Sequence, residues 1–574
     1  MTRIPCFGST AARQRRAWVY WTFVLLAVLP LNPVRAAENE SSLIRLNTVG
    51  YPPEAEKRAA IAAACTNFVV LRLFDNSTVL TGKVTGPVLN PDTQEQLYTA
   101  DFSKLKQPGN YQLDVPGVGR SAPFRIAPDV YREPYYIVMR GFYLWRCGTA
   151  VSATYHGETF AHAACHTNDA WLDYVGGGHT NRNGTKGWHD AGDYNKYTVN
   201  AGVTVGSLFR AWEDFGPQLK AVRLDLPESG GPLPDFLAEL KWEMDWVLTM
   251  QAPDGSVYHK LTTLRFGRFI LPEFETAERY FTPWGSEATA DFVAMTAQAA
   301  RIYRTYDPAY ADRCLEAAQR SYQFLKAHPE YHRADMTGFR TGSYEINQFN
   351  HRQDGIPQNR LWAAAELWET TGSPDALLDL ETRINATHGQ VDSNFDWDET
   401  KDLGLITYLF SQRPGRNPAL VQLVHSNLLA VADDIMQTAS RDGYARPLGS
   451  RYYWGCNGGV ARQTLLLMAA NRLSPGKGVY RATCLDALNH LFGRNGYGRS
   501  FVTGLGFRPP LHPHDRRSGG DNVADPWPGY LVGGPHPGAG DWHDEQSDPS
   551  TNEIAINWNA ALVYALAACL QNPE

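Results

Sequence analysis

The sequence lacks the features that define several large classes of protein. Lys and Arg together number 53 against 60 Asp and Glu, and the resulting net charge of −7 offers no basic surface for nucleic acid. Beyond the N-terminal segment, no apolar run reaches the length of a membrane span. The eight cysteines are scattered through 574 residues, unlike the dense, paired pattern of a disulfide framework. These absences indicate a soluble globular protein with chain enough for roughly two to four domains.

The first residues form a targeting segment. A start containing four arginines precedes an apolar run over residues 17–31, and Val34–Ala36 before Ala37 is typical of a small-residue cleavage site. We therefore predict a signal peptide, residues 1–37, and a mature protein that is secreted or periplasmic, monomeric and free of the membrane. An uncleaved membrane anchor is the alternative, but the apolar run is short for a span. Loss of Cys6 with this segment leaves an odd number of cysteines.

Residues 38–128 are predicted to form a β-domain. Short alternating runs, such as 68–73 and 109–115, are separated by the Asn, Gly and Pro residues that are typical of turns. About 85 residues of this kind make a small β-sandwich. No polar cluster within them suggests chemistry, so we interpret this domain as a packing partner of the one that follows.

From residue 129 to 574 the pattern changes to helices. Apolar residues recur at three- and four-residue spacing in about eleven or twelve segments, the first of which is predicted over 141–155. Long connections rich in Gly and Pro separate these segments, and loops of this length usually carry function. The pattern predicts an all-α domain of paired helices with its site on the loops at one end. Periodicity alone fits a closed barrel and an open solenoid equally well.

The most informative stretch is Gly187–Tyr197, which reads G-W-H-D-A-G-D-Y-N-K-Y. Asp190 and Asp193 flank Gly192, where the backbone can turn tightly and aim both carboxylates into one small volume. Two like charges at this spacing raise one another's pKa and can hold a water between them, as a general base requires. An Asp-Gly surface turn is the ordinary alternative for the bare pattern.

The full stretch resembles the signature of glycoside hydrolase family nine, the inverting cellulase-type enzymes. Further resemblances follow in order through residues 41–570: L-P-D-F-L-A-E-L-K-W-E-M-D-W, R-Y-F-T-P-W-G-S-E-A-T-A-D-F, R-L-W-A-A-A-E-L, Y-Y-W-G-C-N-G-G and F-G-R-N-G-Y-G-R-S-F-V-T-G-L-G. The opening I-R-L-N-T-V-G-Y and the close S-A-P-F-R-I-A of the β-domain resemble the immunoglobulin-like module that precedes many of these catalytic domains. The resemblance implies an immunoglobulin-like β-sandwich followed by an all-α (α/α)6 barrel.

Near the C-terminus, Asn552–Ala560 reads N-E-I-A-I-N-W-N-A and resembles the general-acid motif of the family. The resemblance makes Glu553 the acid and Asp193 the base, with Asp190 helping to hold the water. A lone Glu at the head of an apolar helix would otherwise be a cap or dipole partner. Inversion, which we take from the resemblance, requires the two carboxyl groups to stand roughly 6.5–9.5 Å apart, whereas retention requires about 5 Å.

Further residues are expected to contact the sugar. His514 and Arg516 match the family's residues that grip the sugar at the cleavage point, although a His and an Arg in a Pro-rich loop could equally form surface salt bridges. Aromatic faces stack well on sugar rings. The aromatic residues of the matching motifs that we assign to substrate binding are Tyr197, Trp284, Trp454 and Trp558.

Two residues depart from the pattern of the family. Trp558 stands where the family commonly shows Tyr, and Asp515 where it commonly shows His. Both bear on substrate identity more than on reaction type. The leading hypothesis is hydrolysis of β-1,4-glucosidic bonds in cellulose-type or mixed-linkage glucans and cello-oligosaccharides, with the glucan as the partner. The alternatives are an exo-β-glucosaminidase acting on chitosan oligomers, whose amino sugar an added carboxylate could attract, and a non-catalytic sugar-binding protein.

Two cysteines and two histidines are candidate metal ligands. Cys147, Cys165, His166 and His189 make a closed tetrahedral zinc set by type, although their spacing is not that of a zinc finger. Some members of the family with the immunoglobulin-like module carry zinc at equivalent residues, so the resemblance implies a structural Zn²⁺. A Cys147–Cys165 disulfide is the rival, which export would permit. Members of the family also often bind Ca²⁺ in the loop before R-L-W-A-A-A-E-L. In this chain that loop reads Q-D-G-I-P-Q-N, and Asp354 is its only acidic residue. Other calcium positions remain open.

Overall fold

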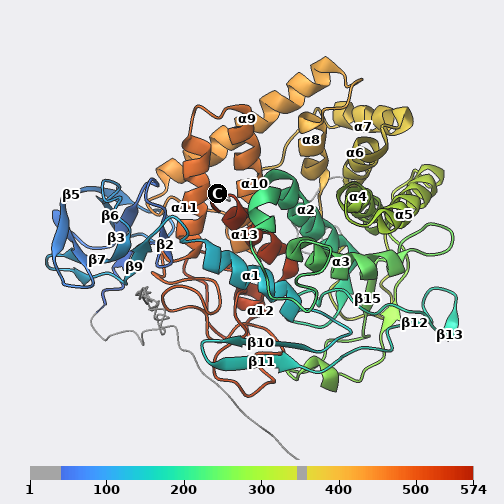
Figure 1. The fold of residues 1–574 in the computed structure, drawn as a ribbon, viewed down its shortest axis with the longest axis horizontal. Helices are drawn as coiled ribbons and strands as arrows, with labels where there is room; N and C mark the ends of the chain where they lie inside the picture. The colour runs from blue at the N-terminus through green and yellow to red at the C-terminus, as the bar shows by residue number, and fades with distance from the viewer. Residues whose placement is uncertain (1–39, 346–357, 573–574) are drawn as a thin grey trace, which may run out of the picture.

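The computed structural model describes residues 40–345 and 358–572, so the predicted signal peptide lies outside the described residues. A β-domain packs against one side of a larger helical domain (Figure 1). The strands of the β-domain end at Ile126 and the first helix begins at Arg132. The two predicted parts of the chain are therefore a β-domain and an all-α domain with short accessory strands.

The β-domain is a nine-stranded sheet that folds over at its longest strand, β5. The first half of β5 pairs with β4 and its second half pairs with β6, with a register shift in each ladder. The two halves of the folded sheet enclose one apolar core. Every second residue of a strand points into this core, as the alternation in the sequence predicts. Its strands are β1 (Ile44–Arg45), β2 (Gly50–Tyr51), β3 (Arg58–Ile61), β4 (Asn67–Arg72), β5 (Thr78–Leu89), β6 (Gln96–Asp101), β7 (Gly109–Val115), β8 (Gly119–Arg120) and β9 (Phe124–Ile126).

Six helices of the second domain are buried on almost every side. Contacts run from α13 through α2, α4 and α6 to α8, and from α13 back to α10. Apolar and small residues all around a helix predict such burial, and α4 and α13 show it along their whole length. These inner helices are α2 (Thr198–Lys220), α4 (Ser286–Tyr303), α6 (Asn359–Thr371), α8 (Lys401–Phe410), α10 (Cys456–Leu473) and α13 (Ile556–Ala567).

Six outer helices bury one face each against this inner set. Each precedes an inner helix along the chain, which is the pairing that an (α/α)6 arrangement requires, and α9 contacts both α8 and α10. The outer helices are α1 (Arg132–Leu144), α3 (Asp235–Val247), α5 (Pro308–Ala327), α7 (Pro374–Ala386), α9 (Pro418–Arg441) and α11 (Val479–Leu491); the short helices are η1 (Leu248–Met250), η2 (Pro272–Phe274) and α12 (Pro549–Asn552).

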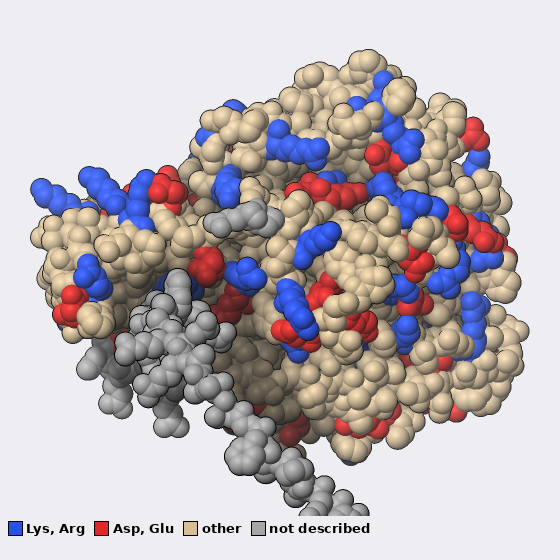
Figure 2. Space-filling view, in the orientation of Figure 1, with Lys and Arg blue, Asp and Glu red and all other residues tan. Residues whose placement is uncertain are grey.

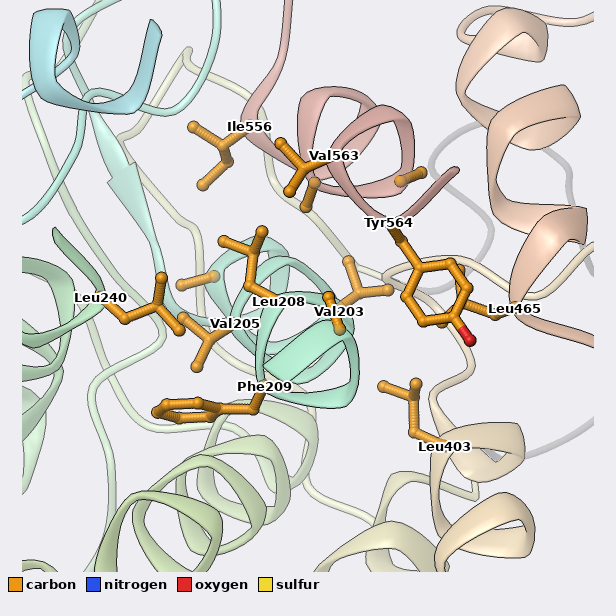
Figure 3. Packing of buried hydrophobic residues seen from close by; sticks show 14 of the residues in the cluster. Val203, Val205, Leu208, Phe209, Leu240, Leu403, Leu465, Ile556, Val563 and Tyr564 are labelled. Atoms are coloured by element: carbon orange, nitrogen blue, oxygen red, sulfur yellow. The ribbon is translucent and has the colours of Figure 1, made fainter. Parts of the chain in front are cut away.

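Helix α2 lies at the centre of the apolar core (Figure 3). Gly206 brings it close to α6, because a Cβ at this position would stand 2.6 Å from the ring of Trp362. The residues of α2 and its neighbours that meet there are Val203, Val205, Leu208 and Phe209, with Leu240 of α3, Leu403 of α8, Leu465 of α10 and Val563 and Tyr564 of α13. This packing fixes the positions of the helix ends that the long loops connect.

The helix predicted over 141–155 is wrong. Helix α1 ends at Leu144, and the chain then pairs with the Gly187–Tyr197 stretch: Cys147 N donates to Gly187 O (2.8 Å) and His189 N donates to Trp145 O (2.9 Å). Residues beyond it form the hairpin of β10 (Val151–Tyr155) and β11 (Glu158–His162). Main-chain pairing to a distant segment therefore overrides the local helical spacing.

A small mixed sheet leads to the same stretch. It contains β12 (Trp171–Leu172), β13 (Gly178–Asn181), β14 (Lys196–Tyr197), β15 (Lys260–Thr262) and β16 (Tyr280–Phe281). Because β14 continues directly into α2, this sheet holds the end of the Gly187–Tyr197 stretch against β15.

The surface corrects one further expectation. By length and composition, α9 could cross a membrane, with a mean hydropathy of 1.2 over an 18-residue window, although the sequence predicts no such stretch beyond the N-terminal segment. Only 22% of that window is buried, and the buried residues recur every three or four positions, as in an amphipathic surface helix. Acidic and basic side chains are interspersed over the face shown in Figure 2.

Candidate active site

Three segments that are distant in the sequence meet beside the ends of α2 and α13. They are the Gly187–Tyr197 stretch, hereafter the base turn, the loop 510–517 and the acid segment Asn552–Ile556. Their main chains are joined directly: Ile556 N donates to Asp190 O (2.9 Å), Arg516 N to Gly192 O (3.1 Å) and His514 N to Asn552 O (2.8 Å). The site is therefore a backbone-bonded unit and not three independent loops.

Gly192 is the point of closest approach between the base turn and the loop. A Cβ at this position would stand 2.1 Å from the carbonyl oxygen of His514, far inside van der Waals contact. The D-A-G-D pattern thus needs its glycine for the space that the neighbouring backbone occupies, since the φ of Gly192 lies outside the left-handed region.

Both carboxylate oxygens of Asp190 accept hydrogen bonds. Asn200 Nδ2 donates to Oδ1 (2.7 Å), and the hydroxyl of Tyr344 donates to Oδ2 (2.7 Å). Burial, reinforced by the nearby charge of Asp193, raises the pKa of Asp190 to about 8. Sequence reasoning missed Tyr344, which comes from a connection 154 residues away and carries no motif that could have marked it.

Asp193 is held in the same way. Asn195 Nδ2 donates to its Oδ2, and the Tyr197 hydroxyl donates to the same oxygen at 3.2 Å. Asn195 is itself fixed, because its Oδ1 accepts from Thr263 N (3.0 Å). Tyr197, predicted to contact sugar, is buried and serves as a hydrogen-bond donor to the predicted base.

Glu553 lies between two helices. The backbone is extended there and forms a bridge with His514, so the helix predicted from Glu553 begins only at Ile556. Burial raises the pKa of Glu553 to about 8, and the charges of Asp193 and Asp190 add to the effect, while Arg516 and the Gly192 backbone oppose it. Within the part of the chain that the structure describes, no side chain donates a hydrogen bond to this carboxyl group. It can therefore hold a proton near neutral pH.

His514 and Arg516, which are predicted to contact the sugar, lie between the base turn and the acid segment. His514 Nδ1 lies 2.7 Å from Gln546 O and donates to it, which leaves Nε2 as the acceptor of the neutral ring. Arg516 donates from Nη1 to Gly192 O (2.7 Å) and from Nε to Gly267 O (3.2 Å). Much of the guanidinium therefore supports the base turn.

The predicted aromatic sugar contacts differ in their placement. Trp284 and Trp454 are partly exposed, and Trp284 stacks on His332 with ring centroids 3.9 Å apart. Trp558 is only 6% exposed and packs against Gly455 and Gly458 at the start of α10. Its burial argues against the predicted stacking on a sugar, because the ring is needed where α13 meets α10.

Asp515 is a structural residue. It is 1% exposed, and its carboxylate accepts from Arg517 Nε (3.0 Å) and Ser518 Oγ (2.8 Å). The proposed attraction of an amino sugar by Asp515 is therefore wrong, because this carboxylate is neither accessible nor unpaired. Both departures from the family pattern thus lie in packing positions.

The four predicted metal ligands come together directly behind the base turn. The ligand atoms of Cys147, Cys165, His166 and His189 all lie within 4.8 Å of one another, and the two sulfurs are not bonded to each other. Cys147 Sγ stands 3.7 Å from His166 Nδ1, and Cys165 Sγ stands 3.7 Å from His189 Nε2. Across residues 40–345 and 358–572 this is the one such group of ligands; Asp354, considered for calcium, lies outside the described residues.

An all-α domain of paired helices, with a carboxylate pair facing a proton-holding glutamic acid, defines a glycoside hydrolase. The chain belongs to glycosyl hydrolase family 9, whose profile matches residues 131–566, and the cellulase N-terminal ig-like domain matches residues 39–120. This confirms the family, the β-domain and the glycoside hydrolase class that the sequence motifs predicted.

Relatives cover nearly the whole chain. Endoglucanase D of Acetivibrio thermocellus is 55% identical over 528 residues, which span 92% of this chain and 83% of that protein. A xyloglucan-specific endo-β-1,4-glucanase of Bacteroides ovatus is 33% identical, covering 92% of this chain and 93% of its own.

Solved structures agree in fold. A metagenome-derived family 9 endoglucanase has a TM-score of 0.86 at 33% identity, covering 92% of this chain and 99% of its own. A zinc-binding triple mutant of a family 9 endoglucanase has a TM-score of 0.83 at 31% identity, covering 91% of this chain and all of its own.

Proposed function

We propose that this enzyme hydrolyses β-1,4-glucosidic bonds in cellulose-type or mixed-linkage glucans and cello-oligosaccharides, with inversion at the anomeric carbon. The observation that carries the proposal is the opposition of two environments, a carboxylate pair supplied with hydrogen-bond donors and a glutamic acid without side-chain donors. The names of two relatives, an endoglucanase and a xyloglucan-specific endo-β-1,4-glucanase, support the substrate class.

We propose one role for each carboxyl group. Glu553, protonated because burial and the neighbouring carboxylates raise its pKa to about 8, gives its proton to the leaving glycosidic oxygen. Asp193, kept ready by the donors Asn195 and Tyr197, takes a proton from the attacking water on the opposite face of the ring. Asp190 helps to hold this water. Arg516 and His514 stand where they can fix the sugar near the acid.

The stereochemistry of the product tests this assignment. Proton NMR of fresh product from a cello-oligosaccharide should show the α-anomer before mutarotation. An initial β-anomer would mean retention and would reject the role of Asp193. Product analysis on carboxymethylcellulose, cello-oligosaccharides and chitosan oligomers completes the test; release of glucosamine as the main activity would overturn the substrate class, which the burial of Asp515 opposes.

We further propose that Cys147, Cys165, His166 and His189 hold one structural Zn²⁺. Two thiolates and two imidazoles are the donors that tetrahedral zinc takes, and all four positions are filled by protein, so the ion would have no Lewis-acid role. Because His189 directly precedes Asp190, a bound ion would anchor the start of the base turn. Elemental analysis, combined with thiol counting after denaturation in chelator, distinguishes the ion from a disulfide. About one zinc per chain with both thiols recovered supports the ion. No zinc and a Cys147–Cys165 bridge would reject it.

We also propose export of the protein to the periplasm or the medium. The basic and apolar character of residues 1–37 supports this. N-terminal sequencing of the mature protein should begin at Ala37 or close to it; an intact Met1 on active cytoplasmic protein would reject the proposal.

A further inference from the structure

His166 has a second neighbour besides the metal cluster. Its Nδ1 faces Cys147 Sγ at 3.7 Å, and its Nε2 lies 3.3 Å from Oε2 of Glu275. The two side chains are only 2% and 6% exposed. By hydrogen-bond geometry, neither His166 Nε2 nor Glu275 Oε2 has a partner among the described residues. Their 3.3 Å contact therefore brings two unpartnered buried atoms together without the alignment of a hydrogen bond.

The second histidine of the cluster differs. His189 directs Nε2 toward Cys165 Sγ at 3.7 Å, and its buried Nδ1 has no hydrogen-bond partner among the described residues. Only one of the two imidazoles thus has a carboxylate behind it. A carboxylate in this position fixes the ring orientation and the tautomer of a histidine ligand and makes it a stronger donor to the metal.

We infer that Glu275 is the carboxylate that orients the ligand His166 of the metal centre. We also infer that Glu275 connects this centre to the Gly267 backbone, which holds Arg516. This inference rests on the zinc proposal above. Glu275 accepts the Nε2 proton of His166, so that Nδ1 is left as the ligand atom. Glu275 acts through His166 and touches neither substrate nor reacting atoms, so it is a positioning residue.

The same carboxylate borders the loop that carries Gly267. A Cβ at Gly267 would stand 2.1 Å from Glu275 Oε1, so the loop backbone and the carboxylate are in direct contact. Gly267 O accepts from Arg516 Nε (3.2 Å), and Arg516 Nη1 donates to Gly192 O in the base turn (2.7 Å). Filling the metal site would therefore order the Glu275 side chain and, through it, the Gly267 backbone. The Arg516 guanidinium, which lies near Glu553, would be ordered in turn.

A second contact holds the same loop from the base turn. The hydroxyl of Tyr194 donates to Ile270 O (2.5 Å), and its ring lies 4.8 Å from the ring of His189. Both histidines of the cluster thus reach the loop, His166 through the Glu275 carboxylate and His189 through the packing of Tyr194. Both contacts therefore link the loop to the residues of the metal cluster.

The test compares Glu275→Ala and Glu275→Gln with Glu273→Gln. Glu273 is the matched control, because it lies in the same loop and accepts from Ala163 N (3.1 Å) without touching a ligand. Zinc affinity is measured on the full-length mature protein by competition with a chromophoric chelator, together with Tm. Glu275→Ala should bind zinc about 10–100-fold more weakly. Glu275→Gln should lose less, since its amide oxygen still accepts the imidazole proton, and Glu273→Gln should match the wild type.

The pH profile provides the second readout. Arg516 lowers the pKa of Glu553, so a displaced guanidinium should move the basic limb of the kcat profile upward in Glu275→Ala and leave it unchanged in Glu273→Gln. Wild-type zinc affinity in both Glu275 variants, or an equal loss in the Glu273 control, would overturn the inference while leaving the zinc site intact. A wild-type protein that binds no zinc would instead reject the zinc proposal itself.

Discussion

The two sides of the proposed cleavage site are built in opposite ways. On the base side, Asp190 and Asp193 come from one short turn, and each accepts hydrogen bonds from an amide and a tyrosine hydroxyl. On the acid side, Glu553 comes from a segment more than 350 residues later and, within the described chain, receives no side-chain hydrogen bond.

This difference separates the functions of chemically similar groups. Donors favour the charged form of a carboxyl group and burial without donors favours the neutral form. At Asp190 burial outweighs the two donors, and its pKa is raised to about 8 as well. The charge of Asp193 contributes to both shifts and helps Glu553 to keep its proton. The acid and the base are thus assigned by their surroundings.

The strongest test removes one side at a time. Asp193→Asn and Glu553→Gln should each lower kcat on cellotetraose by at least ~10²-fold. A cellobioside with a dinitrophenolate leaving group needs no proton, so it should restore much of the activity of Glu553→Gln and little of that of Asp193→Asn. Exposed Glu545→Gln is the control and should behave as the wild type. Equal rescue of both variants would contradict the division of roles.

A second test separates the two sides without changing a carboxyl group. Gly192→Ala would place a methyl group 2.1 Å from His514 O, so the base turn and the loop 510–517 must move apart. Misplacement on this scale should cost about 10²-fold in kcat and lower Tm. Gly476→Ala, where the added methyl meets nothing within 4 Å, is the matched control. Normal activity in Gly192→Ala would show that the close approach is not required.

The smallest expected effect is the stability cost of the buried acid. The pKa of Glu553 is raised from 4.5 to about 8, so the folded state binds the proton more tightly than the unfolded state. Stability is then fully present below pH 4.5 and is lost as pH rises toward 8. Glu553→Gln mimics the protonated form, so its Tm advantage over the wild type should grow by a few degrees between pH 5 and 8 in thermal scans. A constant difference across this range would show that the raised pKa is absent.

The order of elements followed largely from sequence. The strands over 68–73 and 109–115 were confirmed within a residue, because alternation with turn residues is a local signal. The helix over 141–155 was wrong, because backbone pairing with the base turn ends α1 at Leu144.

The sequence by itself marked the residues of the proposed reaction centre: the paired aspartates and the glutamic acid stand in short motifs that resemble those of the family, and the Cys and His set is recognisable by residue type. The tertiary structure alone decided which residues surround them. Tyr344 reaches Asp190 from a distant connection, Glu275 reaches His166, and Asp515 and Trp558 turn inward to pack. Motifs record chemistry that must sit close together along the chain, whereas hydrogen-bond partners and burial are fixed only when separate segments meet in space.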